Sequence, residues 1–76
     1  MSIREWEPTH DRSAVRACFV ELQDIERQSE PGIPRGEQIA DAYLELMDRR
    51  CREFDGIVLV AEQDGAVIGF VGPELA

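Results

Sequence analysis

The stretch VLVAEQDGAVIGFVG, residues 58–72, restricts the fold more than any other part of this chain. Within it, two apolar runs flank the dipeptide Asp64-Gly65. A two-residue hairpin turn of type I′ needs positive φ at both central positions, which Gly adopts freely and Asp adopts at a modest cost. The pattern therefore predicts a β-hairpin that turns at Asp64 and Gly65 and joins strands over 57–61 and 66–72.

Both predicted strands are apolar throughout. The run IVLVA, residues 57–61, has no polar residue on either face, so this strand should be covered on both faces or lie inside a sheet. The run AVIGFVG, residues 66–72, contains Gly69 in mid-strand, which indicates a close approach of backbone or ligand, or a bend. A strand at the rim of a sheet leaves its outer N–H and C=O groups unpaired, so we expect strand 66–72 to attract a partner strand.

The chain before the hairpin predicts one short strand and then a helix. The alternation in IREW favours a strand over 3–6, with Ile3 and Trp6 as its core residues. A helix over about 11–29, capped by Thr9 or Asp11, is indicated by apolar residues at three and four residue spacing. The apolar face predicted for this helix consists of Val15, Cys18, Phe19, Leu22 and Ile25.

A second helix is predicted after the segment SEPGIPRG, residues 29–36, whose two prolines and two glycines indicate a loop. Acidic Glu37 near its start and several arginines near its end follow the charge order that a helix dipole favours, and Gly56 is placed to end it. Its predicted apolar face consists of Ile39, Tyr43, Leu46, Met47, Arg50 and Phe54, with Ala40, Ala42 and Cys51 beside it. The element order is therefore β-α-α-β-β, a mixed α/β chain of the α+β class.

The chain is strongly acidic. Sixteen Asp and Glu residues stand against eight Arg, with no Lys, so the net charge is -8. This charge repels phosphate backbones and anionic lipid, so we expect neither nucleic acid nor a membrane as a partner. The apolar runs are far shorter than the roughly 20 residues of a membrane-spanning helix, and no signal segment opens the sequence. We therefore expect a soluble cytoplasmic protein.

No set of residues forms a recognisable catalytic, cofactor or metal site. Cys18, Cys51 and His10 are too few for a four-ligand zinc site. We interpret the two thiols as reduced core residues, with a disulfide or a reactive thiol as the alternatives. His10 has no catalytic partner near it in sequence, which favours a surface or capping role over general-base catalysis. The glycines and serines match neither the phosphate-binding nor the nucleophile-elbow patterns.

Acidic residues gather at the end of the first helix and in the loop after it. They are Glu21, Asp24, Glu26 and Glu30. Clustered carboxylates raise the local concentration of cations, so one interpretation is a rim that attracts an amine substrate. The other interpretation is an ordinary solvated helix face, interleaved with Arg27.

The whole pattern resembles the N-terminal half of the GNAT superfamily of N-acetyltransferases. The resemblance rests on the IREW strand, the helix entry EPTHDRSAV, the second helix and the hairpin IVLVAEQDGAVIGFVG. Residue-level similarity lies in the hairpin, where the family shows a strand ending in Val-Ala-Glu, an Asp-Gly turn and a strand of the form apolar-Ile-Gly-Phe. The matching segments are Val60-Ala61-Glu62, Asp64-Gly65 and Val67-Ile68-Gly69-Phe70.

The resemblance implies that residues 1–76 form a single partial domain, a partial antiparallel GNAT sheet of three strands with two helices. In the family, acetyl-coenzyme A binds between the fourth and fifth strands, and a Gln/Arg-x-x-Gly-x-Gly/Ala loop holds its pyrophosphate. Neither that loop nor the fourth strand is in this sequence, so no catalytic, cofactor-binding or metal-binding residue is assigned. The loop between the two helices flanks the acceptor substrate in the family, which makes Glu26 and Glu30 the implied substrate-side residues.

Two hypotheses follow. In the first, the chain is the acceptor-side half of an acetyl-coenzyme A-dependent N-acetyltransferase, truncated or split. That half is inactive alone and pairs through strand 66–72 with a second copy or with a complementary C-terminal half. In the second, the chain is a small acidic protein-interaction module that dimerises through its last strand or through the apolar faces of its helices.

Overall fold

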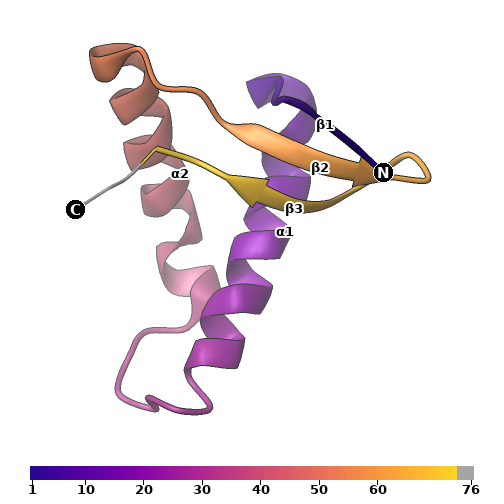
Figure 1. Cartoon of the computed structure of the whole chain (residues 1–76). Coiled ribbons are helices and arrows are strands. Elements are labelled where there is room, and N and C mark those ends of the chain that lie inside the picture. Colours follow the sequence, from indigo (N-terminus) through magenta and orange to yellow (C-terminus); the bar gives the residue numbers. More distant parts are fainter. Residues whose placement is uncertain (74–76) are drawn as a thin grey trace.

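The computed structural model describes residues 1–73, and its elements follow the predicted order (Figure 1). They are β1 (Ser2–Glu5), α1 (Pro8–Glu26), α2 (Gly36–Phe54), β2 (Leu59–Gln63) and β3 (Ala66–Val71). The three strands form one antiparallel sheet in the order β1-β2-β3. The structure thus confirms the α+β class, the order β-α-α-β-β and the interior position of β2.

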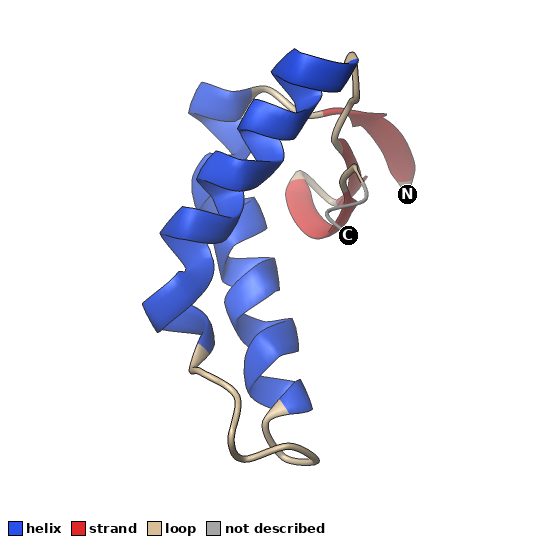
Figure 2. Ribbon diagram, turned by 90° about the vertical axis from the view of Figure 1, so that its left-hand side faces the viewer, coloured by secondary structure: helices blue, strands red, loops and turns tan. Residues whose placement is uncertain are grey.

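The molecule has two layers. Both helices lie on one face of the sheet, and the connection between them lies at the end remote from the strands (Figures 1 and 2). The overall extents are 33 × 32 × 18 Å, which describes a flat slab. The other face of the sheet carries no helix of residues 1–73, and we call it the helix-free face.

The core lies between the sheet and the helices. Its buried residues are Trp6, Val15, Leu44, Met47, Val58 and Val60. Each fully buried side chain of this size contributes roughly 1.5–3 kcal/mol by leaving water. Beside this core, the rings of Phe19 and Tyr43 stack at 4.2 Å between centroids, and Phe70 meets Tyr43 edge-on at 6.5 Å. The stacked rings tie α1 to α2, and Phe70 joins β3 to both.

The hairpin turns where the sequence predicts. Asp64 has φ 53° and Gly65 has φ 79°, the positive pair that a type I′ turn requires. The first strand of the hairpin, β2, spans Leu59–Gln63 and not the predicted 57–61, because Glu62 and Gln63 pair with Val67 and Ala66 in the ladder. Polar residues therefore extend the strand toward the turn.

A β-bulge interrupts the pairing of β2 with β3. Ala61 pairs with Gly69 but Glu62 pairs with Val67, so Ile68 is the extra residue. The bend expected at Gly69 is thus a bulge next to it. Because of the extra residue, Val67 and Phe70 both pack against the core although they are three positions apart.

Helix α1 begins at Pro8 and ends at Glu26, three residues earlier at each end than predicted. Neither Thr9 nor Asp11 is the N-cap, because the N-cap residue is Glu7, which makes no side-chain capping bond. Proline suits the first helical position, where its missing N–H is not needed. Asp11 instead lies inside the first turns and accepts a hydrogen bond from the Glu7 amide at 2.7 Å.

The buried side of each helix matches the predicted side only in part, since Val15, Phe19 and Met47 are buried as predicted. On α1, Val15 and Phe19 are buried, whereas Leu22 and Ile25 are each 53% exposed. On α2, the predicted face is rotated: Phe54 is 67% exposed, and Ile39, Tyr43, Leu46 and Arg50 are half-buried. The residues buried along α2 are Gly36, Ala40, Leu44 and Met47.

Close contact between the helices explains the rotation of α2. A Cβ atom added at Gly36 would lie 2.6 Å from the Val20 Cα atom, so α2 meets α1 through its glycine and the small residue Ala40 one turn later. The following turns then bring Leu44 and Met47 to the core. The predicted C-cap is also wrong by one residue, since Asp55, with φ 53°, is the left-handed residue that ends α2.

Ile3 is not the core residue that the alternation in IREW predicts. It is 59% exposed, because it pairs with Ala61 on the helix-free face, while Trp6 is buried as predicted. The short strand spans Ser2–Glu5, and the Trp6 amide donates to the Val58 carbonyl at 2.9 Å.

Candidate functional site

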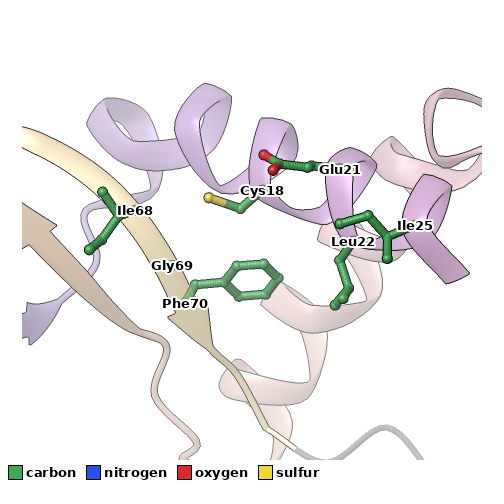
Figure 3. Close-up of a pocket in the computed structure, with 7 residues that line it drawn as sticks. All are labelled: Cys18, Glu21, Leu22, Ile25, Ile68, Gly69 and Phe70. Atoms are coloured by element: carbon green, nitrogen blue, oxygen red, sulfur yellow. The ribbon is translucent and has the colours of Figure 1, made fainter.

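An open groove runs between α1 and the outer edge of β3 (Figure 3). It has a volume of about 280 Å³. Its lining residues are Cys18, Glu21, Leu22, Ile25, Ile68, Gly69 and Phe70. We call it the α1/β3 groove.

The two sides of the groove come from elements with different roles in the fold. β3 is the last strand of the described sheet, and no other strand of residues 1–73 pairs with its outer edge. Beside that edge, α1 presents Leu22 and Ile25, which are three positions apart and therefore on one side of the helix. The groove thus combines unpaired backbone groups with exposed apolar side chains.

Phe70 gives the groove a fixed wall. Its ring and the Leu22 side chain point toward one another across the groove (Figure 3). Tyr43 of α2 meets Phe70 edge-on and itself stacks on Phe19 of α1. The two helices together therefore restrain the Phe70 ring. This wall is therefore formed before any ligand binds.

The groove has little catalytic chemistry. Cys18 is a free thiol, and its pKa is raised by partial burial and by the negative charge of Glu21. A raised pKa disfavours the thiolate, which is the nucleophilic form of cysteine. The groove is therefore suited to holding apolar side chains and a strand backbone rather than to reacting with a substrate.

The structure brings Glu26 and Glu30 together. They line a shallow depression with Ile25 and Ser29, and the Glu30 amide donates to the Glu26 carbonyl at 3.0 Å. Both residues are exposed: Glu26 is the last residue of α1, and Glu30 belongs to the connection between the helices, which is remote from the strands (Figure 1). This position is compatible with either interpretation of the acidic cluster.

The other two members of the acidic cluster lie apart from this depression. Glu21 lines the α1/β3 groove. Asp24 accepts a hydrogen bond from the Gly36 amide at 3.0 Å and so supports the start of α2. Asp24 thus has a structural role, since it satisfies an amide that a helix start leaves without a partner.

The most buried charged group in the described chain is one that the sequence analysis missed. Asp11 is 2% exposed and receives two hydrogen bonds from Arg4, at 2.7 and 2.9 Å. Arg4 also donates to Glu62 at 3.0 Å. The paired guanidinium and the Glu7 amide hold the pKa of Asp11 far below its usual range, and the two carboxylates raise the pKa of Arg4.

This cluster is structural. Within residues 1–73, every buried side-chain nitrogen and oxygen has a hydrogen-bond partner, so the buried carboxylate of Asp11 is fully paired inside the fold. It joins β1 to α1 through Asp11 and to β2 through Glu62. The sequence carried one signal for it: Arg4 is two positions before the buried Trp6 and therefore shares its face of the strand.

The remaining candidates have no reactive arrangement. His10 is exposed on the first turn of α1, and Cys51 is a second free thiol that is not joined to Cys18. No group of three or more potential metal ligands comes together in residues 1–73. In the same residues, neither helix combines the length and the apolar character needed to cross a membrane.

Comparison with known proteins gives no assignment. None of the protein families, curated proteins or solved structures compared with this chain matches it.

Proposed function

We propose that this chain is the acceptor-side half of a GNAT-type, acetyl-coenzyme A-dependent N-acetyltransferase, with the cofactor-binding half supplied from outside these 76 residues. In this proposal the chain alone neither binds acetyl-coenzyme A nor transfers an acetyl group. A further strand pairs with β3 and completes the sheet.

The observation that carries this proposal is the outer edge of β3, which no other strand of the described residues pairs with. An apolar strand with free N–H and C=O groups is a template for another strand. The α1/β3 groove supports the pairing, because Leu22 and Ile25 offer apolar contacts to side chains of the incoming strand. The element order and the hairpin around Asp64 and Gly65 agree with the family resemblance.

Glu26 and Glu30 have a defined role in the proposal. Their carboxylates attract a cationic amine to the acceptor side, and their exposure leaves them free to do so. They are binding residues, since neither faces a reacting atom in the described chain.

Calorimetric titration with acetyl-coenzyme A tests the proposal. The 76-residue chain should give no binding heat, and a micromolar Kd for this chain alone would contradict the proposal. The reading frame immediately downstream of Ala76 provides the complementary test. A version of the chain extended through a Gln/Arg-x-x-Gly-x-Gly/Ala segment should bind acetyl-coenzyme A, and a frame without such a segment would remove support for a truncated or split enzyme.

The exposed Leu22, Ile25 and Ile68 support a second candidate, an acidic interaction module that dimerises through the edge of β3. The variant Ile68→Lys tests it, because a lysine on a strand edge opposes strand addition. Light scattering should show a dimer for the parent chain and a monomer for Ile68→Lys. A dimer that persists in Ile68→Lys would exclude this edge as the interface.

A further inference from the structure

The helix-free face of the sheet carries an apolar hollow, which shares the lining residues Gly69 and Phe70 with the α1/β3 groove. Its volume is about 300 Å³. Its lining residues are Ile3, Leu59, Val60, Ala61, Gly69, Phe70 and Val71. None of these residues is charged, and Ile3 and Val71 are 59% and 70% exposed. An exposed apolar patch with no charge in it is typical of a protein interface.

The register of the sheet explains how five of these residues, all except Val60 and Phe70, come to one face. Ile3 pairs with Ala61, Ala61 with Gly69, and Leu59 with Val71. Paired residues of antiparallel strands point to the same face, and Val60 between Leu59 and Ala61 points into the core. The side chains of the paired residues therefore point away from the helices.

The chain exposes more surface than a compact monomer of its size. The chain exposes 5350 Å², whereas a compact monomer of 8.6 kDa exposes about 4,700 Å². The excess of roughly 650 Å² is close to the about 800 Å² that each partner contributes to a standard interface. The radius of gyration is 12.7 Å, which is also larger than the value of about 11.4 Å for a compact domain of this length.

The distribution of charge allows a second copy of the chain to occupy this face. A chain with a net charge of -8 repels its own copies unless they meet through a neutral surface. The hollow is such a surface, since the acidic residues of both helices belong to the opposite layer, and Glu5 lies at its rim opposite Leu59. Two sheets that pack at their usual separation of about 10 Å would hold the two helical layers farther apart than the Debye length of about 8 Å.

We propose that a second copy of this chain packs on the helix-free face, so that two sheets meet face to face in a two-fold symmetric α-β-β-α dimer. The contact is isologous, with Ala61 and Gly69 near its centre and Ile3 and Val71 around them. The proposal does not depend on the proposed function, because it uses the face of the sheet, whereas the proposed function uses the outer edge of β3.

Gly69→Lys is the central test. A Cβ atom at Gly69 meets nothing within 4 Å, so the monomer can accept the side chain, while a lysine in the contact would bury a charge. Ala61→Lys is the second variant at the same contact, and Ala61, unlike Gly69, does not line the α1/β3 groove. Ala42→Lys is the matched control, because it adds the same charge at an exposed position on α2. All three reduce the net negative charge, so general repulsion between copies cannot explain a loss of association.

Analytical ultracentrifugation over a concentration series gives the dimer Kd for each variant, and circular dichroism verifies folding. Gly69→Lys and Ala61→Lys should each raise the Kd at least about tenfold, while Ala42→Lys and Ile68→Lys leave it unchanged. Higher salt should tighten the parent dimer, since it screens repulsion between acidic copies. A parent chain that stays monomeric into the high-micromolar range overturns the proposal. So does a dimer that survives both lysines on the helix-free face or is lost in Ile68→Lys alone.

Discussion

Arg4 and Asp11 meet through two parallel hydrogen bonds of 2.7 and 2.9 Å, and this pair fixes the first turns of α1 to β1. The bidentate geometry is the strongest form of an arginine–carboxylate contact. Since Asp11 is almost fully buried, removing its charge would leave the Arg4 guanidinium with an incomplete set of acceptors.

The first prediction concerns pH. The folded-state pKa of Asp11 lies below its ordinary value of 3.8, so its contribution to stability is complete above that value and is lost as the pH falls further. Urea unfolding should therefore show that the parent chain loses more unfolding free energy between pH 7 and pH 3 than Asp11→Asn does. At pH 7 the variant should be the less stable of the two, and equal stability at pH 7 would contradict the role assigned to this pair.

The second prediction concerns the buried side of α2. Leu44→Ala should cost about 2–5 kcal/mol of unfolding free energy, because Leu44 is fully buried and its truncation leaves a cavity. Phe54→Ala is the comparison, since Phe54 is largely exposed and contacts Arg50. It should cost no more than about 1 kcal/mol. Chemical denaturation of both variants measures these two costs. A larger cost for Phe54→Ala than for Leu44→Ala would support the face predicted from sequence.

The third prediction concerns the contact between the helices. Gly36→Ala should cost about 1–3 kcal/mol, because the new methyl group would overlap the Val20 backbone. Gly32→Ala provides a matched control in the preceding loop, where an added Cβ meets nothing, and should change stability by no more than about 0.5 kcal/mol. If thermal unfolding shows both substitutions to be equally mild, the helices do not approach at Gly36.

The fourth prediction concerns the hairpin turn. Gly65→Ala should cost about 1–2 kcal/mol, because an alanine is strained at φ 79°. Asp64→Asn should keep or slightly increase stability, since asparagine adopts this turn conformation more readily. Denaturation curves give the change in unfolding free energy for each variant. The two changes should have opposite signs or clearly different sizes, and equal changes would argue against a type I′ turn.

The sequence predicted the parts of this molecule that depend on neighbours in the chain. The turn at Asp64-Gly65 is local chemistry, and the order of elements follows from periodicity and from the prolines and glycines of residues 29–36. The faces of the helices depend on what packs against them. Both helices carry apolar residues around more than half their circumference, so spacing alone did not distinguish Leu44 from Phe54.

Long-range contacts account for the other misses. The side chains of this cluster come from β1, α1 and β2, and Glu62 is 58 positions from Arg4, so no short motif indicates the cluster. The α1/β3 groove was anticipated only as the free edge of strand 66–72. Its helical wall depends on the angle at which α1 crosses the sheet, which residue spacing does not determine.

The bulge at Ile68 adds one residue to β3, so the alternation of side chains between the two faces of the sheet shifts by one position at Ile68. Deleting Ile68 would give regular pairing on either side, but Val67 and Phe70 would then become two positions apart and would still share the core face. The core would therefore be unchanged by a chain one residue shorter. Homologous hairpins of this kind are expected to differ in length at this position, and a sequence alignment of such chains should place its gap here and not in the turn.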